Sequence, residues 1–234
     1  MIGCAGTSTL TSIEVFHFTG MQRLWAFAMM ARAPRLLRGV AGLRFAKVMG
    51  SGRGLGFTLR PDWNRYALLG VWENREAFEQ FRTSSRLMRL YTAHTTRSSA
   101  LLLRTRTAHG TWDGTNPFLP TLSARQDHAM EEVVVLTRAT LRLRTLPTFW
   151  RHVPRVQQKL HGAGGFIASI GVGERPLTRQ ATISLWQSEA GMRAFAYGAG
   201  EEHREVVRLT REEKWYSEEL FARFDLIERI GDFP

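Results

Sequence analysis

A short motif occurs once in each half of the chain. Trp72 is followed by Glu-Asn-Arg-Glu-Ala-Phe and Trp186 by Gln-Ser-Glu-Ala-Gly-Met, and in both copies a phenylalanine comes three positions later. In each copy the tryptophan closes an apolar run, and Asn74 or Ser188 stands where a helix N-cap belongs. The repeat therefore predicts two halves of similar architecture, each with a strand that ends at the tryptophan and a helix that follows it.

Apolar periodicity extends this pattern to a full set of elements in each half. Alternating residues favour strands, and spacings of three to four residues favour helices. The first half is expected to contain strands at 13–18, 43–49, 66–72 and 99–106, with helices at 22–40, kinked near Pro34, and at 74–90. The second half is expected to contain strands at 132–137, 165–171, 180–186 and 219–224, with helices at 146–160 and from 189 onward. Segment 42–46 is expected to correspond to segment 164–168.

Both halves then have the order β-α-β-β-α-β, which is the ferredoxin-like order. The turn-rich segment GTWDGTNPF, at residues 110–118, connects them, so the expected halves are residues 1–119 and 120–234. Two such sheets in one chain can pack face to face and cover each other. The predicted fold is thus α+β, with two tandem ferredoxin-like halves that form a dimeric α+β barrel within one chain.

Composition limits the classes of partner. The chain has 32 Lys and Arg against 21 Asp and Glu, for a formal net charge of +11. Such a surface can serve nucleic acid, anionic lipid or an anionic cofactor, but no helix-turn-helix, zinc-finger or RNA-binding aromatic motif is present, so nucleic acid is not an expected partner. The single Cys4 excludes a disulfide framework within the chain. No apolar run is long enough for a membrane span or a secretory signal, so a cytoplasmic protein is expected.

The first predicted helix carries an unusually wide apolar stripe. Trp25, Met29 and Met30 add to the residues at helical spacing. Such stripes are most often core, but this one leaves contact with a lipid surface or a large hydrophobic ligand open. Association with a second copy of the chain is also left open.

A glycine-rich run follows the second predicted strand. The sequence GSGRGLGF at residues 50–57 suggests a phosphate loop, but that loop needs a helix immediately after it, whereas another strand follows here. It is also the main length difference between the halves. We therefore expect residues 50–60 to form a mobile lid or wall at the mouth of a pocket, because alternating glycines lose much entropy on ordering.

Five segments resemble the spheroidene monooxygenase family of carotenoid biosynthesis: RLWAFAMM, AKVMGSGRGLGF, YALLGVW, GTWDGTNPF and EKWYSEELFARF. The resemblance runs from about Ile13 to Phe224. It implies a haem-dependent monooxygenase that acts on a small hydrophobic, carotenoid-like substrate, on a fold similar to chlorite dismutases and aldoxime dehydratases. Those relatives hold haem in the C-terminal half on a histidine from its helical region, and His203 matches that position best.

The residues around His203 are compatible with an axial ligand of haem b. His203, Val206 and Val207 share one face of a predicted helix, so Val207 would press on the porphyrin plane. No pair of histidines has the spacing of a zinc or non-haem iron site, and a single histidine suits haem because the porphyrin supplies the other four ligands. A lone histidine on a helix, with Glu201 and Glu202 before it, is equally compatible with a structural or exposed role.

Three further residues are candidates for the same pocket. Arg223 lies among apolar residues of the last strand, where a buried guanidinium needs a carboxylate, a propionate or an iron-bound oxygen species as partner; an outward-facing arginine on an alternating strand explains it equally well. Lys47 and Ser51, on the strand and loop around the glycine-rich run, could line that pocket too.

Two other functions stay open: a haem enzyme of different chemistry, such as aldoxime dehydration or nitrogen-centred redox chemistry, and a non-enzymatic barrel that binds an apolar ligand or another copy of itself.

Overall fold

The computed structural model describes residues 9–118, 132–198 and 215–233. Its N-terminal half contains, in chain order, β1 (Leu10–His17), α1 (Gln22–Leu36), β2 (Leu43–Gly52), β3 (Pro61–Trp72), α2 (Arg75–Ser84), α3 (Arg86–His94) and β4 (Arg97–Gly110). Its C-terminal half contains β5 (Val133–Leu141), a 3₁₀ turn η1 (Leu143–Thr145), α4 (Leu146–His161), β6 (Phe166–Arg175), β7 (Arg179–Trp186), α5 (Glu189–Gly198) and β8 (Tyr216–Ile230).

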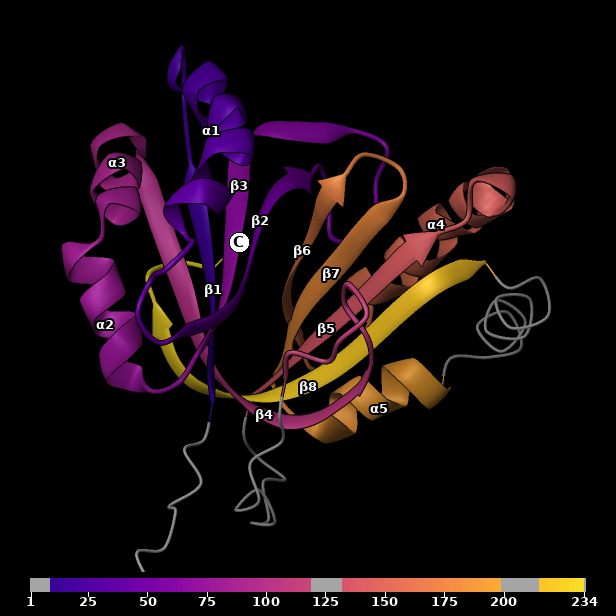
Figure 1. The fold of residues 1–234 in the computed structure, drawn as a ribbon. Coiled ribbons are helices and arrows are strands. Elements are labelled where there is room, and N and C mark those ends of the chain that lie inside the picture. Colours follow the sequence, from indigo (N-terminus) through magenta and orange to yellow (C-terminus); the bar gives the residue numbers. More distant parts are fainter. Residues whose placement is uncertain (1–8, 119–131, 199–214, 234) are drawn as a thin grey trace, which may run out of the picture.

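The eight strands form one closed barrel with the order β1-β3-β2-β6-β7-β5-β8-β4 (Figure 1). Within it each half keeps the ferredoxin-like order, β4-β1-β3-β2 and β8-β5-β7-β6. The two sheets are joined at their edges by backbone pairing in addition to facing each other. One seam, between β4 and β8, is long, whereas the other, between β2 and β6, pairs only Gly50 with Gly173 and Ser51 with Val172. The predicted α+β barrel of two halves within one chain is confirmed.

The barrel interior is an apolar core to which both halves contribute alternate strand residues. Ile13, Leu69, Leu136 and Ile183 are among its fully buried members. The other face of each sheet carries the helices, which Figure 1 shows outside the barrel on both sides. No helix in the described ranges is both long and apolar enough to cross a membrane.

The repeat appears as equivalent hydrogen bonds at equivalent places. Glu73 donates its backbone N–H to the Gly42 carbonyl at 2.8 Å, and Gln187 donates to the Gly165 carbonyl at 2.8 Å. Gly42 and Gly165 both have positive φ, 71° and 77°, which favours glycine. The expected correspondence between segment 42–46 and segment 164–168 in the repeat is therefore wrong by one residue.

Two helix boundaries differ from the sequence prediction. The helix expected at 74–90 is broken at Ser85, whose extended backbone ends α2 and whose hydroxyl accepts from the Met88 N–H to cap α3. Hydroxyl side chains favour such caps over helix interiors. The first helix ends at Leu36 rather than at residue 40, two residues after Pro34. The Asn74 cap is confirmed, since its side chain accepts from the Ala77 N–H at 2.8 Å.

Candidate functional site

The outer face of the C-terminal sheet, which lies between α4 and α5, is built from small and polar residues. Its central row across four strands is Phe221, Thr137, Thr182 and Gly171, as the strand register shows. The neighbouring row is Arg223, Val135, Ser184 and Ser169. We call these eight residues the C-face. Their strand neighbours point into the barrel core, so the C-face points outward toward the helices.

The C-face is only partly covered. Phe221 is 43% exposed, whereas Leu220 and Ala222 on either side of it are buried in the barrel. Apolar contacts with the helices gather at the two ends of the sheet, one around Phe149 of α4 and the other around Met192 of α5. Figure 1 shows α4 and α5 set apart from each other on the outer side of these strands. Among the described side chains, those of the helices thus meet the C-face at its two ends rather than at its centre.

The glycine-rich connection between β2 and β3 forms one wall of this region. Leu55 packs with the cluster around Met192, and the Phe57 ring meets the Phe149 ring edge to face at 5.5 Å. The Gly56 carbonyl lies so close to Gly171 that a Cβ at residue 171 would come within 1.9 Å of it. A segment of the N-terminal half therefore closes over the C-terminal sheet, as a wall rather than as a phosphate loop.

An arginine and carboxylate cluster stands at the start of α5, beside the C-face. Arg223 Nη1 lies 3.3 Å from Glu189 Oε1, and Arg106 Nη1 lies 2.8 Å from Glu189 Oε2. Arg106 also pairs with buried Asp225. Burial opposes ionisation of Glu189, but its hydrogen bond with Arg193 and the nearby charges outweigh burial and lower its pKa. Arg223, 26% exposed, thus stands at the edge of the face with a carboxylate partner, as a buried guanidinium requires.

One buried hydroxyl on the C-face lacks a partner. Ser169 is 2% exposed, and its Oγ has no hydrogen-bond partner among the described residues. A buried hydroxyl without a partner costs free energy, so Ser169 marks a place where a ligand atom would be stabilised.

The structure brings only part of the predicted site together. His203 and Val207 lie outside the described residues. Arg223 stands at the C-face as described above. Lys47 faces the barrel interior, on the opposite side of the wall from Arg223, because alternate residues of a strand face opposite sides. Ser51 is buried at the short seam beside Val172. The expectation that Lys47 lines the same pocket as Arg223 is not met by this geometry.

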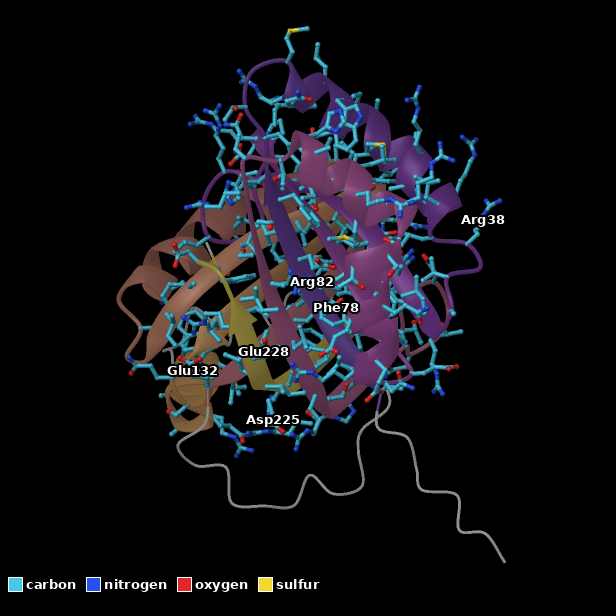
Figure 2. The ribbon with its side chains drawn as sticks, turned by 90° about the vertical axis from the view of Figure 1, so that its left-hand side faces the viewer. Arg38, Phe78, Arg82, Glu132, Asp225 and Glu228 are labelled. Atoms are coloured by element: carbon cyan, nitrogen blue, oxygen red, sulfur yellow. The ribbon has the colours of Figure 1, made fainter. Side chains whose placement is uncertain are left out.

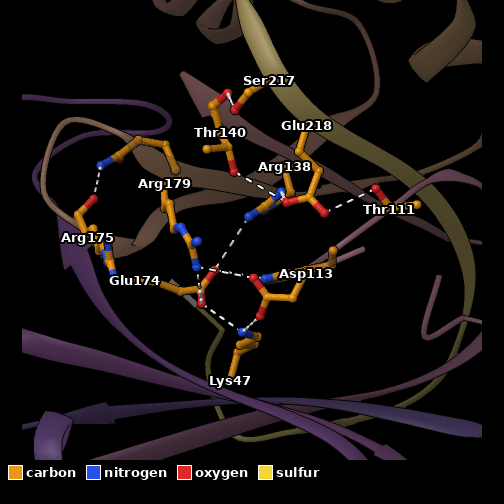
Figure 3. A network of polar contacts seen from close by, with 12 residues as sticks. Lys47, Thr111, Asp113, Arg138, Thr140, Glu174, Arg175, Arg179, Ser217 and Glu218 are labelled. Carbon is orange, nitrogen blue, oxygen red and sulfur yellow. Dashed lines mark hydrogen bonds and ion pairs between the residues drawn. The ribbon is translucent and has the colours of Figure 1, made fainter. Parts of the chain in front are cut away.

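Lys47 belongs instead to a charged network at one end of the barrel (Figure 3). It pairs with Glu174 at 2.8 Å and with Asp113 of the linker. Arg138, 1% exposed, pairs with Glu218. Burial opposes the ionisation of Asp113, but the hydrogen bond and charge of Lys47 together with the charges of Arg179 and Arg138 outweigh burial and lower the Asp113 pKa. Three cations and three carboxylates, completed by Arg179, therefore balance each other in a half-buried place.

This network fixes the GTWDGTNPF linker as a plug in the barrel. Trp112 is fully buried in the barrel core, and its indole N–H donates to Glu174 Oε1 at 2.8 Å. Phe118 is also buried, with its ring 5.1 Å from the Phe224 ring. Sequence reasoning missed this role. The signal was Arg138, a charge at an inward position of the alternating strand Val133–Leu141.

Among solved structures the chain resembles aldoxime dehydratases. One has a TM-score of 0.58 at 11% identity, covering 95% of this chain and 83% of that one. Another, crystallised in complex with butyraldoxime, has a TM-score of 0.60 at 10% identity, covering 99% of this chain and 85% of that one. At such identities the likeness shows a shared fold alone. No protein-family model matches the chain.

Sequence relatives are closer. The chain is 35% identical over 225 residues to the spheroidene monooxygenase of Rhodobacter capsulatus, covering 96% of this chain and 92% of that protein. It is 33% identical over 221 residues to that of Cereibacter sphaeroides (94% and 67%) and 32% identical over 203 residues to that of Rubrivivax gelatinosus (86% and 76%). These matches confirm the resemblance read from the sequence motifs. The chain belongs to the spheroidene monooxygenase family.

Proposed function

We propose that this protein is a haem-dependent monooxygenase that oxygenates a hydrophobic, carotenoid-like substrate, with haem b over the C-face and His203 as its axial ligand. The names of its relatives support a monooxygenase function. The observation that supports the place of the cofactor is the composition of the C-face. At the centre of the sheet, where the N-terminal half has Val48 and Leu68 buried against its helices, the C-terminal half has Gly171 and Thr182. The neighbouring row does not follow this pattern, since Val135 and Ser184 stand where the N-terminal half has Ser12 and Gly70.

The comparison can be made position by position from the strand register. Thr182, next to Gly171 and Thr137, corresponds to Leu68, next to Val48 and Glu14. Likewise Ala139 corresponds to Phe16. These smaller side chains lie on one side of the sheet, and a planar, mostly apolar ring system could rest against them. The residues present therefore fit a porphyrin.

Several side chains at the C-face could contact a bound haem. The exposed ring of Phe221 offers apolar contact, and Ser169 Oγ offers a hydrogen bond to a buried ligand atom. Arg223 and Arg106 both contact Glu189, and Arg106 also pairs with Asp225, so guanidinium groups gather at this edge of the face, where a propionate could bind them. Bound haem would supply the iron chemistry that activates oxygen.

Chain connectivity supports His203 as the candidate ligand. Its segment joins the end of α5 at Gly198 to the start of β8 at Tyr216, and both of those elements border the C-face. The competing histidine is His152 of α4, whose Nδ1 lies 2.8 Å from the Thr148 carbonyl and whose ring lies 5.6 Å from Trp215. His152 therefore already has a packing role within its helix.

The proposal is tested with protein expressed with ample haem. We expect a Soret band in the wild type, its loss or displacement in His203→Ala with partial recovery by added imidazole, and retention in His152→Ala. The opposite pattern would move the ligand to α4. Absence of a Soret band in the wild type would leave a barrel that binds no haem.

Chemistry is tested separately from binding. Incubation of the holoenzyme with an acyclic carotenoid, a reductant and heavy-isotope dioxygen should give a product that carries the label. Conversion of an aldoxime to a nitrile without conversion of the carotenoid would instead support the alternative of a haem enzyme of different chemistry.

A further inference from the structure

A row of large apolar side chains is exposed at the start of α1. Met21, Leu24 and Phe27 are 77%, 64% and 56% exposed. They continue onto the β2–β3 hairpin, where Trp63 is 49% exposed and its ring meets that of Phe27 at 5.4 Å, edge to face. Large apolar side chains that gather on two neighbouring elements form a patch, and such patches mark interaction surfaces. We call these four residues the α1 patch.

The segment that carries the patch is basic throughout. No Asp or Glu stands between Glu14 and Asp62, whereas seven arginines and one lysine do. Arg32 and Arg35 on α1 and Arg38 just after it are exposed, and no carboxylate in the described part of the chain pairs with any of them. Figure 2 shows Arg38 at the outer end of this helix, directed away from the barrel. These cations are therefore available to an external anion.

A cavity of about 490 Å³ lies beside the patch, at the start of α1. Its lining includes His17, Arg23, Asn64 and Arg97, and no carboxylate. Arg97 Nη2 lies 3.4 Å from His17 Nε2. Burial, and after it the charges of Arg97 and Arg65, lower the pKa of His17, although the charge of Asp62 opposes this. The cavity is thus suited to an anionic group with polar oxygens.

We propose that the α1 patch, the exposed Arg32, Arg35 and Arg38, and this cavity form a docking surface for an anionic phospholipid bilayer. The apolar side chains enter the boundary between headgroups and acyl chains, as aromatic and aliphatic residues of interfacial helices do. The arginines meet the anionic headgroups. Arg23 and Arg97 in the cavity bind the phosphate of one lipid.

Charge decides between this occupant and a second copy of the chain. A two-fold symmetric dimer through the α1 patch would bring the same surface of each copy together, and with it two sets of unpaired arginines. An anionic bilayer instead neutralises these arginines. Its acyl chains also take up the apolar side chains of the patch, for which a polar partner offers no apolar surface. The inference does not rest on the proposed chemistry, although a bilayer is where a carotenoid-like substrate would dissolve.

The test is flotation of the full chain with vesicles. We expect binding to vesicles of equal parts phosphatidylcholine and phosphatidylglycerol, weakened by added salt, and little binding to phosphatidylcholine alone. The triple variant Arg32→Gln, Arg35→Gln, Arg38→Gln should weaken binding about 100-fold, since each arginine near an anionic surface contributes about a factor of five. Phe27→Ser with Trp63→Ser should weaken it more than about 10-fold.

Matched controls lie in the C-terminal half. Arg144→Gln, Arg151→Gln and Arg175→Gln remove the same charge, and Leu143→Ser with Leu177→Ser remove exposed apolar side chains elsewhere. Both controls should bind as the wild type does. If the control triple variant lost as much vesicle binding as the triple variant of Arg32, Arg35 and Arg38, net charge alone would explain the binding, and the proposed docking surface would be wrong.

Three other outcomes would also overturn it. The first is no binding to anionic vesicles. The second is binding of free glycerol phosphate, lost in Arg23→Gln with Arg97→Gln, by a protein that ignores vesicles. The third is a dimer, seen by light scattering, that Phe27→Ser with Trp63→Ser dissociates while vesicles stay unbound.

Discussion

The two halves share one topology but use the outer faces of their sheets differently. In the N-terminal half, Phe16, Tyr66 and Leu68 on the sheet are buried against α1, α2 and α3. In the C-terminal half the equivalent positions hold Ala139, Gln180 and Thr182. The two faces share a strand register and differ in the size and polarity of their side chains. Under the proposal above, one half uses this face for stability and the other keeps it for a ligand.

The largest expected effect on stability comes from replacing Leu68, in the N-terminal face, by threonine, the residue at the equivalent position 182 of the C-face. Leu68→Thr removes buried apolar volume and places a hydroxyl in an apolar cluster, so the free energy of unfolding should fall by about 4 kcal/mol. Urea denaturation measures it. Leu68→Ile, which keeps the volume, is the control and should lose much less. A loss below 1 kcal/mol would mean that this face is as loosely packed as the C-face.

The second effect concerns Glu14, a carboxyl buried in the N-terminal face where the C-face has Thr137. Glu14 is 2% exposed, and Arg82 is its nearest cation, with Nε 3.7 Å from Oε2. Figure 2 labels Arg82 on the outer helix above this sheet. Burial raises the pKa of Glu14 from 4.5 to about 7, although the charge of Arg82 opposes this.

The sign of the pH effect follows from that direction. The folded protein holds the Glu14 proton more tightly than the unfolded chain does. The stability that protonated Glu14 contributes is therefore full below pH 4.5, falls as pH rises, and is lost above about pH 7. Glu14→Gln should therefore be more stable than wild type at pH 8, by at most about 3 kcal/mol, and similar to it at pH 4. Denaturation at both pH values measures the difference. Arg82→Gln should steepen the fall; equal stability of Glu14→Gln and wild type at pH 8 would contradict the buried state.

The sequence predicted the order of elements because each half repeats the same periodicity and caps. It could not settle the alignment of Gly42 with Gly165 rather than Gly164, because a one-residue shift leaves the local pattern almost unchanged. It also placed Lys47 with Arg223, since neither the sheet face nor the closure of the barrel can be read from a single strand. Arg223 lies at the edge of the C-face, where its predicted role stays a prediction, whereas the plug role of Trp112 depends on partners far away in sequence.

A third, smaller effect concerns the glycine-rich wall that the N-terminal half extends over the C-face. Gly54 has a φ of 100°, and a Cβ on Gly52 would come within 2.0 Å of the Thr58 methyl. Gly52→Ala with Gly54→Ala should cost about 1–2 kcal/mol of stability. It should change substrate turnover more than haem content, measured as product rate and Soret absorbance.

The control for this wall is a glycine with similar strain elsewhere. Gly39 has a φ of 73° and open space around its Cβ position, so Gly39→Ala should cost about 1 kcal/mol without changing turnover. Equal loss of haem and turnover in the Gly52 and Gly54 variant would make the segment part of the haem site's framework instead.

The smallest effect on stability comes from the reverse exchange, Thr182→Leu, which gives the C-face the side chain of Leu68. Because Thr182 is only half-buried, whereas Leu68 is buried, the free energy of unfolding should change by less than about 1 kcal/mol. Haem content should nevertheless fall sharply, because the added side chain occupies the centre of the face. Thr182→Val, which keeps the shape and removes only the hydroxyl, should retain haem. A loss of stability as large as that of Leu68→Thr would show that the C-face is packed after all, and unchanged haem content in Thr182→Leu would place the cofactor elsewhere. The same exchange made in both directions therefore separates a face that stabilises the fold from a face that binds.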